Sequence, residues 1–93
     1  PVLAEGRIAR GYAGCFDVSP DWHPILDRVG PTGYHVAAGF SGHGFKLSPA
    51  VGHMMATLIL DEPSGHHDLP TFRLSRFAEG KPIRGTYGDW LMC

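Results

Sequence analysis

Apolar and polar residues alternate along residues 7–18, which read RIARGYAGCFDV. An extended chain over this segment would carry large side chains on one side and small residues on the other. A period of two residues is typical of a β-strand, so the segment is predicted to form one strand, or two short strands interrupted near Gly14. The large side chains are Ile8, Tyr12, Phe16 and Val18, and the small residues are Ala9, Gly11, Ala13 and Cys15.

The pattern changes to a helical period between residues 48 and 61. Apolar residues recur there at spacings of three and four, which places them on one face of an α-helix. Ser48 is a suitable N-cap, Pro49 is a suitable first helical residue, and the DEP sequence at 61–63 would end the helix. The main helix is therefore predicted over about 48–61. Its apolar stripe consists of Val51, Met54, Met55, Leu58 and Ile59.

Two short apolar segments lie between these patterns. Residues 25–29 (ILDRV) and 34–40 (YHVAAGF) are each predicted to form a strand, and the GPTG sequence at 30–33 is predicted to form the turn between them. The SPDWHP sequence at 19–24 is predicted to form a turn before the first of these strands, because its prolines fix the local backbone and disfavour helix.

The last quarter of the chain is less regular. Residues 69–77 (LPTFRLSRF) are predicted to form a short helix that begins at Pro70, and residues 78–93 an irregular tail. No internal repeat or linker divides residues 1–77, which are interpreted as one unit. The fold class is therefore predicted to be α+β, with a few-stranded antiparallel sheet, one main helix and a short C-terminal helix.

Composition narrows the classes of function. The chain has 93 residues and a net charge of −1 without a long basic run, so nucleic-acid binding is not indicated. The longest apolar run, MMATLIL at 54–60, is too short for a membrane span. Cys15 and Cys93 form no CxxC pair, which is typical of a reduced protein, and a cytoplasmic location is expected. Because the chain begins with Pro1 rather than Met, it is interpreted as a fragment or a processed product.

A glycine-rich loop, GFSGHGFK at residues 39–46, connects the second predicted strand to the main helix. A strand, a glycine-rich loop and a helix in this order present free backbone N–H groups to an anion or to an electron-rich ring edge. The spacing is GxxGxG, which differs from the GxGxxG dinucleotide motif, and no GK[ST] sequence of a P-loop follows. By itself the pattern is equally typical of a tight turn.

Two side chains of this loop are candidates for chemistry. Lys46 lies close to the start of the predicted helix, where the helix dipole disfavours a cation. A substrate carboxylate would offset that cost, whereas the alternative is a solvated lysine. His43 stands between two glycines and has little local packing, so its alternative role is that of a surface loop histidine.

Three stretches of the chain follow a familiar pattern in the same order. They are PVLAEGRIARGYAGCFDVSPDWHPILD, GYHVAAGFSGHGFKLSPAVGHMMATLI and DLPTFRLSRF, and together they extend over residues 1–77. This pattern resembles the carboxy-terminal flavin-binding segment of the D-amino-acid oxidase and sarcosine oxidase superfamily, which consists of FAD-dependent amine oxidoreductases.

The resemblance implies roles for the glycine loop. In this superfamily the loop approaches the pyrimidine edge of the flavin, and its backbone N–H groups stabilise the negative charge of the reduced ring. The lysine that matches Lys46 binds the substrate carboxylate, and the histidine that matches His43 lies in the active site, so both are candidate catalytic residues. The residues implied to contact the cofactor are Gly42, His43, Gly44, Phe45 and Lys46.

Two departures from the superfamily carry further expectations. Members with covalent flavin have a cysteine six residues before the proline of the turn, but here that position is Gly14, and Cys15 would point to the opposite face of a strand. FAD is therefore expected to bind non-covalently. The GxGxxG motif is absent, so the chain resembles the last quarter of a larger two-domain enzyme and is expected to be inactive by itself.

The resemblance implies that the parent protein oxidises a C–N bond of an amino acid or secondary amine by hydride transfer to the flavin. The substrate would be similar to sarcosine, glycine or a D-amino acid, and the partner would be the missing N-terminal FAD-binding part. The exposed edges of such a fragment predict self-association. The alternative is a small, non-enzymatic binding or interaction module derived from this fold.

The remaining candidates are interpreted as structural residues. His66 and His67 have no third ligand at a recognisable spacing, so no metal site is predicted. Arg76 is expected to form a structural ion pair rather than to bind substrate, and Tyr12 is expected to pack against other residues. His23 is interpreted as a turn residue, His53 as a helix-surface residue, and Met54 and Met55 as core residues.

Overall fold

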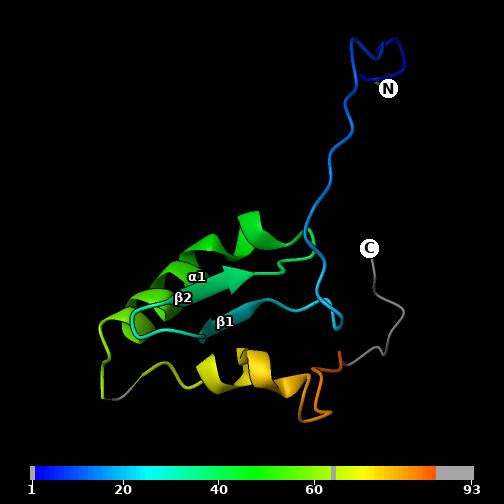
Figure 1. The fold of residues 1–93 in the computed structure, drawn as a ribbon. Helices are drawn as coiled ribbons and strands as arrows, with labels where there is room; N and C mark the ends of the chain where they lie inside the picture. Colours follow the sequence, from blue (N-terminus) through cyan, green and yellow to red (C-terminus); the bar gives the residue numbers. More distant parts are fainter. Residues whose placement is uncertain (1, 64, 86–93) are drawn as a thin grey trace.

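The computed structural model describes residues 2–63 and 65–85. This part of the chain forms a two-stranded antiparallel hairpin, one α-helix and two short 3₁₀-helices (Figure 1). The α+β class, the small antiparallel sheet and the single main helix are therefore confirmed. The elements are β1 (Ile25–Arg28), β2 (His35–Ala38), α1 (Gly44–Ile59), η1 (Leu69–Phe72) and η2 (Leu74–Arg76).

The hairpin agrees with the two strands and the turn predicted at residues 25–40. Its register places Ile25 opposite Ala38 at the open end of the hairpin. At the closed end, the backbone N–H of Val29 donates to the carbonyl of Tyr34 at 3.2 Å. The strands pair because the GPTG turn reverses the chain within the four residues between Val29 and Tyr34.

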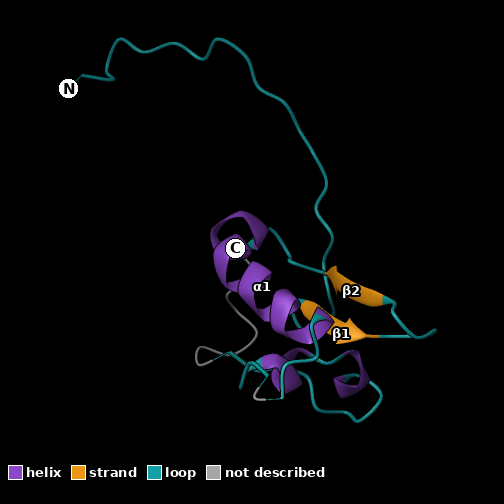
Figure 2. Cartoon of the chain, turned by 90° about the vertical axis from the view of Figure 1, so that its left-hand side faces the viewer, coloured by secondary structure: helices purple, strands orange, loops and turns teal. Residues whose placement is uncertain are grey.

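Helix α1 lies against one face of the hairpin, and η1 and η2 lie along the side of β1 that faces away from β2 (Figure 1, Figure 2). Two apolar side chains form the buried core of the described residues: Leu26 of β1 is 2% exposed and Met54 of α1 is 5% exposed. Thr57 is buried one turn after Met54, and its hydroxyl donates to the Met54 carbonyl at 2.8 Å. The apolar core is therefore small, and polar contacts carry much of the tertiary structure.

The start of α1 differs from the prediction by four residues. The helix begins at Gly44 with His43 as its N-cap, so Ser48 is not the N-cap and Pro49 lies inside the helix. Proline has no N–H to donate to the carbonyl four residues earlier. The hydroxyl of Ser48 donates to that carbonyl, which belongs to Phe45, at 2.9 Å. The Ser-Pro pair therefore allows the helix to continue, although it is typical of a helix start.

Helix α1 ends at Ile59, two residues before the DEP sequence at 61–63 that was predicted to stop it, and the backbone of this sequence closes the helix. Asp61 has a φ of +55°, and the N–H of Glu62 donates back to the carbonyl of Thr57 at 3.1 Å. This is the hydrogen-bond pattern of a Schellman motif. The guanidinium of Arg28 donates to the Asp61 carboxylate at 2.8 Å and thereby connects β1 to the end of the helix. Among the described residues, no helix has the length and apolar character needed to cross a membrane.

The strand predicted over residues 7–18 is wrong. Residues 7–17 are exposed and without strand structure, and they extend away from the other elements (Figure 1); Val18 alone forms an isolated bridge, with Phe40. An extended segment becomes a strand only when a neighbour takes up its backbone hydrogen bonds, and no described residue does so for residues 7–16. The packing predicted for Tyr12 is wrong for the same reason, since Tyr12 is 99% exposed.

The C-terminal segment is close to its prediction. Two 3₁₀-helices occupy most of residues 69–77 in place of one short helix, and Pro70 lies in the first turn of η1. Residues 78–85 have no regular secondary structure, as predicted for the tail. The rest of that predicted tail, residues 86–93 with Cys93, lies outside the described residues.

Truncating Met54 tests the position of the core. Because Met54 is buried, Met54→Ala in the intact protein is expected to lower the free energy of unfolding by about 2–5 kcal/mol. Ile59→Ala is the matched control, since Ile59 belongs to the same stripe but is 55% exposed, and its effect is expected to stay within about 0.5 kcal/mol. Chemical denaturation measures both, and equal losses would contradict this assignment of the core.

Candidate functional site

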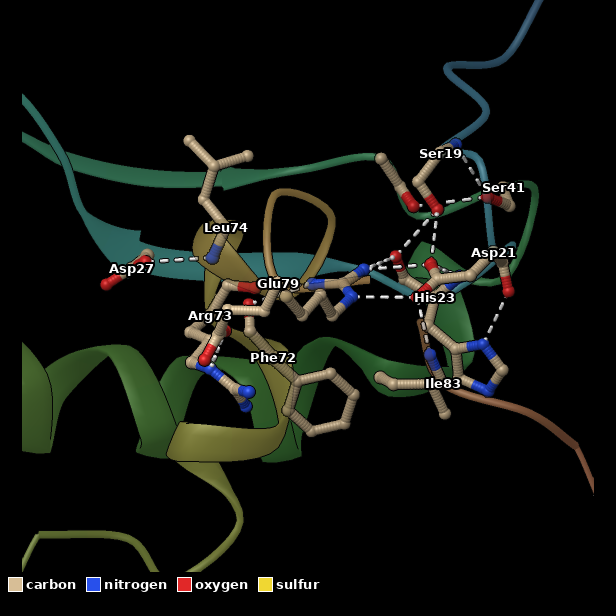
Figure 3. A network of polar contacts seen from close by, with 12 residues as sticks. Ser19, Asp21, His23, Asp27, Ser41, Phe72, Arg73, Leu74, Glu79 and Ile83 are labelled. Atoms are coloured by element: carbon tan, nitrogen blue, oxygen red, sulfur yellow. Dashed lines mark hydrogen bonds and ion pairs between the residues drawn. The ribbon is translucent and has the colours of Figure 1, made fainter. Parts of the chain in front are cut away.

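A buried ion pair joins η2 to the turn that precedes β1. The guanidinium of Arg76 is fully buried and donates to the two carboxylate oxygens of Asp21 at 2.7 and 2.8 Å. Its other N–H groups donate to the carbonyls of His23, Phe72 and Arg73 at 2.9, 3.1 and 3.1 Å. The structural role predicted for Arg76 is therefore confirmed, and His23 belongs to the turn as predicted (Figure 3).

Asp21 remains charged in this buried position because it accepts several hydrogen bonds. Burial disfavours the carboxylate and would raise the pKa of Asp21. The hydrogen bonds from Arg76, from the backbone N–H of Ile83 and from that of His23 outweigh this effect and hold the pKa of Asp21 well below its usual range. The ionised pair is thus part of the native structure at neutral pH.

The same turn holds the glycine loop through two buried serines. The hydroxyl of Ser19 donates to the carbonyl of His23 at 2.7 Å, and the backbone N–H of Ser19 donates to the hydroxyl of Ser41 at 3.3 Å. Ser19 and Ser41 are 4% and 2% exposed, and both lie beside Asp21 in Figure 3. A chain of hydrogen bonds therefore runs from the buried ion pair to the loop.

Asp17 provides a second attachment. Its carboxylate accepts a hydrogen bond from the backbone N–H of Gly39, and its carbonyl accepts one from Ser41 at 2.8 Å. The sequence analysis assigned no role to Asp17, Ser19 or Ser41. A signal was present, because Asp17, Ser19 and Asp21 are polar residues spaced by two, which places them on one side of an extended segment.

The loop backbone adopts conformations that few residues tolerate. Ser41 has a φ of +53° and Gly42 a φ of +82°. Such a conformation at a non-glycine residue costs on the order of 1–3 kcal/mol unless the surroundings support it, and the buried hydrogen bonds of Ser41 provide that support. At Gly44 the constraint is space, since a Cβ there would lie 3.2 Å from the Cβ of Phe40. Glycine is thus favoured at Gly42 by its backbone conformation and at Gly44 by the limited space beside Phe40.

The loop leads into α1 with its backbone donors turned away from the rest of the chain. The N–H of His43 donates to the carbonyl of Phe40 at 2.9 Å, but the groups on either side of it have no acceptor within the described residues. The first turn of α1 contains no acidic residue that could use them, and the helix dipole adds partial positive charge at this end. This junction can therefore bind an anion or a row of acceptor atoms. The unpaired N–H groups belong to Gly42, Gly44, Phe45 and Lys46.

The three non-glycine residues that the resemblance implied as cofactor contacts lie at this junction. His43 is half-buried and makes no capping hydrogen bond to the helix. Phe45 is 98% exposed. Lys46 is exposed, and no acidic side chain of the described residues forms an ion pair with it. The lysine therefore remains open to an external anion.

The positions connected with covalent flavin precede Val18. Gly14 and Cys15 both belong to the extended, exposed segment before Val18, and Cys15 is a free thiol. Non-covalent FAD binding remains a prediction.

Known proteins share much of this chain. A family model described as "FAD dependent oxidoreductase" matches residues 1–58. N-methyl-L-tryptophan oxidase from Salmonella dublin is 41% identical over 80% of this chain and 20% of its own length. Monomeric sarcosine oxidase from a Bacillus species is 38% identical over 81% of this chain and 19% of its own length. A Drosophila melanogaster homolog of FAD-dependent oxidoreductase domain-containing protein 1 is 34% identical over 89% of this chain.

These relatives are much longer than the chain. The chain spans 16–20% of the length of the three proteins named above. No solved structure is significantly similar to it.

The loop–helix junction fits the flavin part of FAD. The pyrimidine edge of an isoalloxazine ring presents hydrogen-bond acceptors and gains negative charge on reduction. The junction offers unpaired donors from Gly42 to Lys46, the positive end of a 16-residue helix and an exposed surface. No acid of the first helical turn would repel the charge.

Replacing Asp21 by Asn tests the ion pair. Because Arg76 would keep its charge in a buried position without a counter-ion, Asp21→Asn in the intact protein is expected to cost about 3–5 kcal/mol of stability. Glu62→Gln is the control, since Glu62 is exposed, and should change stability by about 0.5 kcal/mol or less. A loss of equal size in both variants would contradict the role of the pair.

The pH dependence of stability gives an independent check. Since the pKa of Asp21 is lower in the folded state than its usual value of 3.8, the pair contributes fully above that value and its contribution is lost as the pH falls below it. The stability difference between wild type and Asp21→Asn should therefore shrink in denaturation series taken from pH 6 down to about pH 2. A difference that stays constant over this range would argue against an ionised Asp21.

Proposed function

The chain belongs to the FAD dependent oxidoreductase family, and we propose that it is the C-terminal part of an enzyme that oxidises a C–N bond of an amino acid or secondary amine. The cofactor of this family is FAD, which when bound accepts the two electrons of the substrate as a hydride. The observation that carries the proposal is the row of unpaired N–H groups beside the unpaired Lys46. The substrate class we favour is similar to sarcosine, glycine or a D-amino acid, and two of the relatives are named as oxidases of N-methylated amino acids.

The backbone of residues 42–46 holds and polarises the flavin edge in this proposal. Donors that are fixed before the reaction stabilise developing negative charge without reorganising, which is the advantage of a preorganised site. The buried hydrogen bonds of Ser41 fix the loop. The exposed ring of Phe45 adds apolar surface for the flavin at the same junction.

Lys46 binds the substrate carboxylate. Its side chain is exposed, it starts from the first turn of α1, and both its own charge and the helix dipole attract an anion to this place. His43 precedes the helix and is half-buried, so we assign it a place in the active site beside the flavin edge. Lys46 and His43 thus remain the proposed catalytic residues.

Large apolar side chains on the surface support a role as part of a larger protein. Contiguous exposed apolar surface is typical of interfaces, and the extended segment before Val18 presents such side chains along its length. We propose that this surface packs against an FAD-binding part of the same protein, and that the isolated chain associates with itself. The exposed side chains include Val2, Leu3, Ile8, Tyr12, Phe16 and Phe45.

The isolated 93 residues are expected to bind FAD poorly and to have no oxidase activity, because the described residues offer donors for the flavin edge alone. Gel filtration with absorbance at the flavin maximum tests this, with the intact protein as the positive control. One equivalent of FAD eluting with the isolated chain would overturn the proposed division of the cofactor site.

Lys46→Met tests the carboxylate site in the intact enzyme. A charge-assisted hydrogen bond contributes about 1.5–3 kcal/mol, so the dissociation constant for sarcosine should rise by about 10- to 150-fold. FAD content should stay unchanged, because backbone groups bind the flavin. Sarcosinamide, which lacks the carboxylate, should lose little affinity.

Lys81→Met is the matched control, since Lys81 is also an exposed lysine but lies outside the junction. It should leave both ligands unaffected. If Lys46→Met weakens acid and amide equally, the carboxylate role is wrong. If the wild-type enzyme oxidises neither sarcosine, glycine nor D-amino acids, the proposed reaction itself is wrong.

A further inference from the structure

Three potential metal ligands gather in the loop between α1 and η1. One ligand atom each from His66, His67 and Asp68 lies within 4.8 Å of the other two. The imidazole rings of His66 and His67 are stacked, with centroids 4.7 Å apart and planes 17° apart. No third ligand was predicted for this histidine pair from the sequence; in the structure the carboxylate of the next residue, Asp68, lies close to a nitrogen of each ring.

The separations are close to those of a tetrahedral zinc site. Zinc lies about 2.0–2.2 Å from nitrogen and oxygen ligands, which places any two tetrahedral ligand atoms about 3.3–3.5 Å apart. Nε2 of His67 lies 3.3 Å from Oδ1 of Asp68, and Nδ1 of His66 lies 3.9 Å from Oδ2 of Asp68. Because the two rings are nearly parallel, one imidazole would turn out of the stack for both histidines and the carboxylate to bind one ion.

His53 of α1 contacts one member of this cluster. The ring of His53 meets the ring of His66 edge-on, with centroids 5.7 Å apart and planes 79° apart. His66 is the least exposed member, with 23% of its side chain accessible, whereas His67 is 85% accessible. The contact with His53 restricts the orientation of His66, and a ligand that is already oriented loses less entropy when the ion binds.

The chemistry of these donors selects the type of ion. Imidazole nitrogens suit zinc and its transition-metal neighbours, whereas magnesium and calcium prefer oxygen ligands alone. Asp61 is paired with Arg28, but residues 62–68 contain two further acids and no lysine or arginine, so the local charge favours a cation. Asp68 is the N-cap of η1 but makes no side-chain capping hydrogen bond, which leaves its carboxylate free for a metal.

One hydrogen bond would be given up on binding. The backbone N–H of Asp68 donates to Nδ1 of His66 at 3.2 Å. Metal coordination through Nδ1 would replace that bond, while coordination through Nε2 would preserve it. The bond fixes the imidazole of His66 beside the backbone of Asp68 in the ion-free chain.

We propose that His66, His67 and Asp68 form a zinc site with water in the fourth position. The site lies beyond the C-terminal end of α1, whereas the glycine loop lies at the N-terminal end (Figure 1). Its role is to fix the 60–68 loop against α1 and η1, and it is separate from the flavin and substrate chemistry.

The experiment is a titration of the intact protein with ZnCl₂ by isothermal titration calorimetry, after treatment with a chelator and dialysis. One equivalent of zinc is expected to bind at this site. The His66→Gln/His67→Gln double variant should lose that equivalent or bind it more than about 10-fold more weakly, and Asp68→Asn should also weaken it. Zinc should raise the melting temperature of the wild type and not that of the double variant.

His35→Gln is the matched control, since His35 is a partly exposed histidine of β2 outside the cluster, and it should bind zinc like the wild type. The FAD absorbance of every variant shows that it is folded. Unchanged zinc affinity in the double variant, or an equal loss in His35→Gln, overturns the proposal. A crystal soaked in zinc whose anomalous signal lies away from His66, His67 and Asp68 also overturns it.

Discussion

The placement of the glycine loop depends on the buried ion pair between Arg76 and Asp21. All five N–H donors of the guanidinium are used, two of them on the carboxylate and three on backbone carbonyls. Burial of two charges is costly unless their hydrogen bonds are complete. Here the pair is complete on both sides, since Asp21 also accepts from the backbone of Ile83. In a chain with only a small apolar core among its described residues, this polar cluster fixes how the C-terminal segment meets the turn before β1.

The ion pair influences the loop through a series of hydrogen bonds that fix its backbone, rather than through the packing of side chains. Asp21 and His23 hold Ser19, and Ser19 holds Ser41, whose positive φ shapes the turn into α1. Each link is a hydrogen bond between groups that are buried or half-buried, where geometry is stricter than at a solvated surface. A site that works through backbone N–H groups needs this kind of support, because no side chain of the site can be repositioned to correct an error in the backbone.

Local patterns predicted the elements whose cause is local. The hairpin at 25–38 follows from two apolar segments around a GPTG turn, and α1 follows from a stripe with helical spacing. The predicted start of α1 was wrong because the hydroxyl of Ser48 donates a hydrogen bond to the Phe45 carbonyl from within the helix. The Ser-Pro sequence alone does not reveal this hydrogen bond. The prediction of a strand over 7–18 was wrong because the alternation of large and small residues describes only the two faces of a segment. It does not show whether a neighbouring strand is present.

The candidate site also has a part that local sequence predicts and a part that only the fold assembles. Its loop residues are consecutive, so the sequence alone placed Gly42 to Lys46 together. Their supports are distant in sequence, since Ser19 and Ser41 are 22 positions apart and Asp21 and Arg76 are 55 positions apart, and only the fold brings them together. Of these, Arg76 was assigned to an ion pair, but its partner could not be named, because several acids of the chain were equally suitable.

Helix α1 separates two regions of different chemistry. Its N-terminal end carries unpaired donors and an unpaired lysine, whereas its C-terminal end is closed by the Schellman turn and by Arg28 on Asp61. A fully capped C-terminal end lets the helix act as a rigid support, so that its free end keeps a fixed position. The histidine cluster lies beyond the capped end and contacts the helix through His53. An ion held there would stabilise the support without touching the reacting groups, so its loss should be seen in stability before it is seen in catalysis.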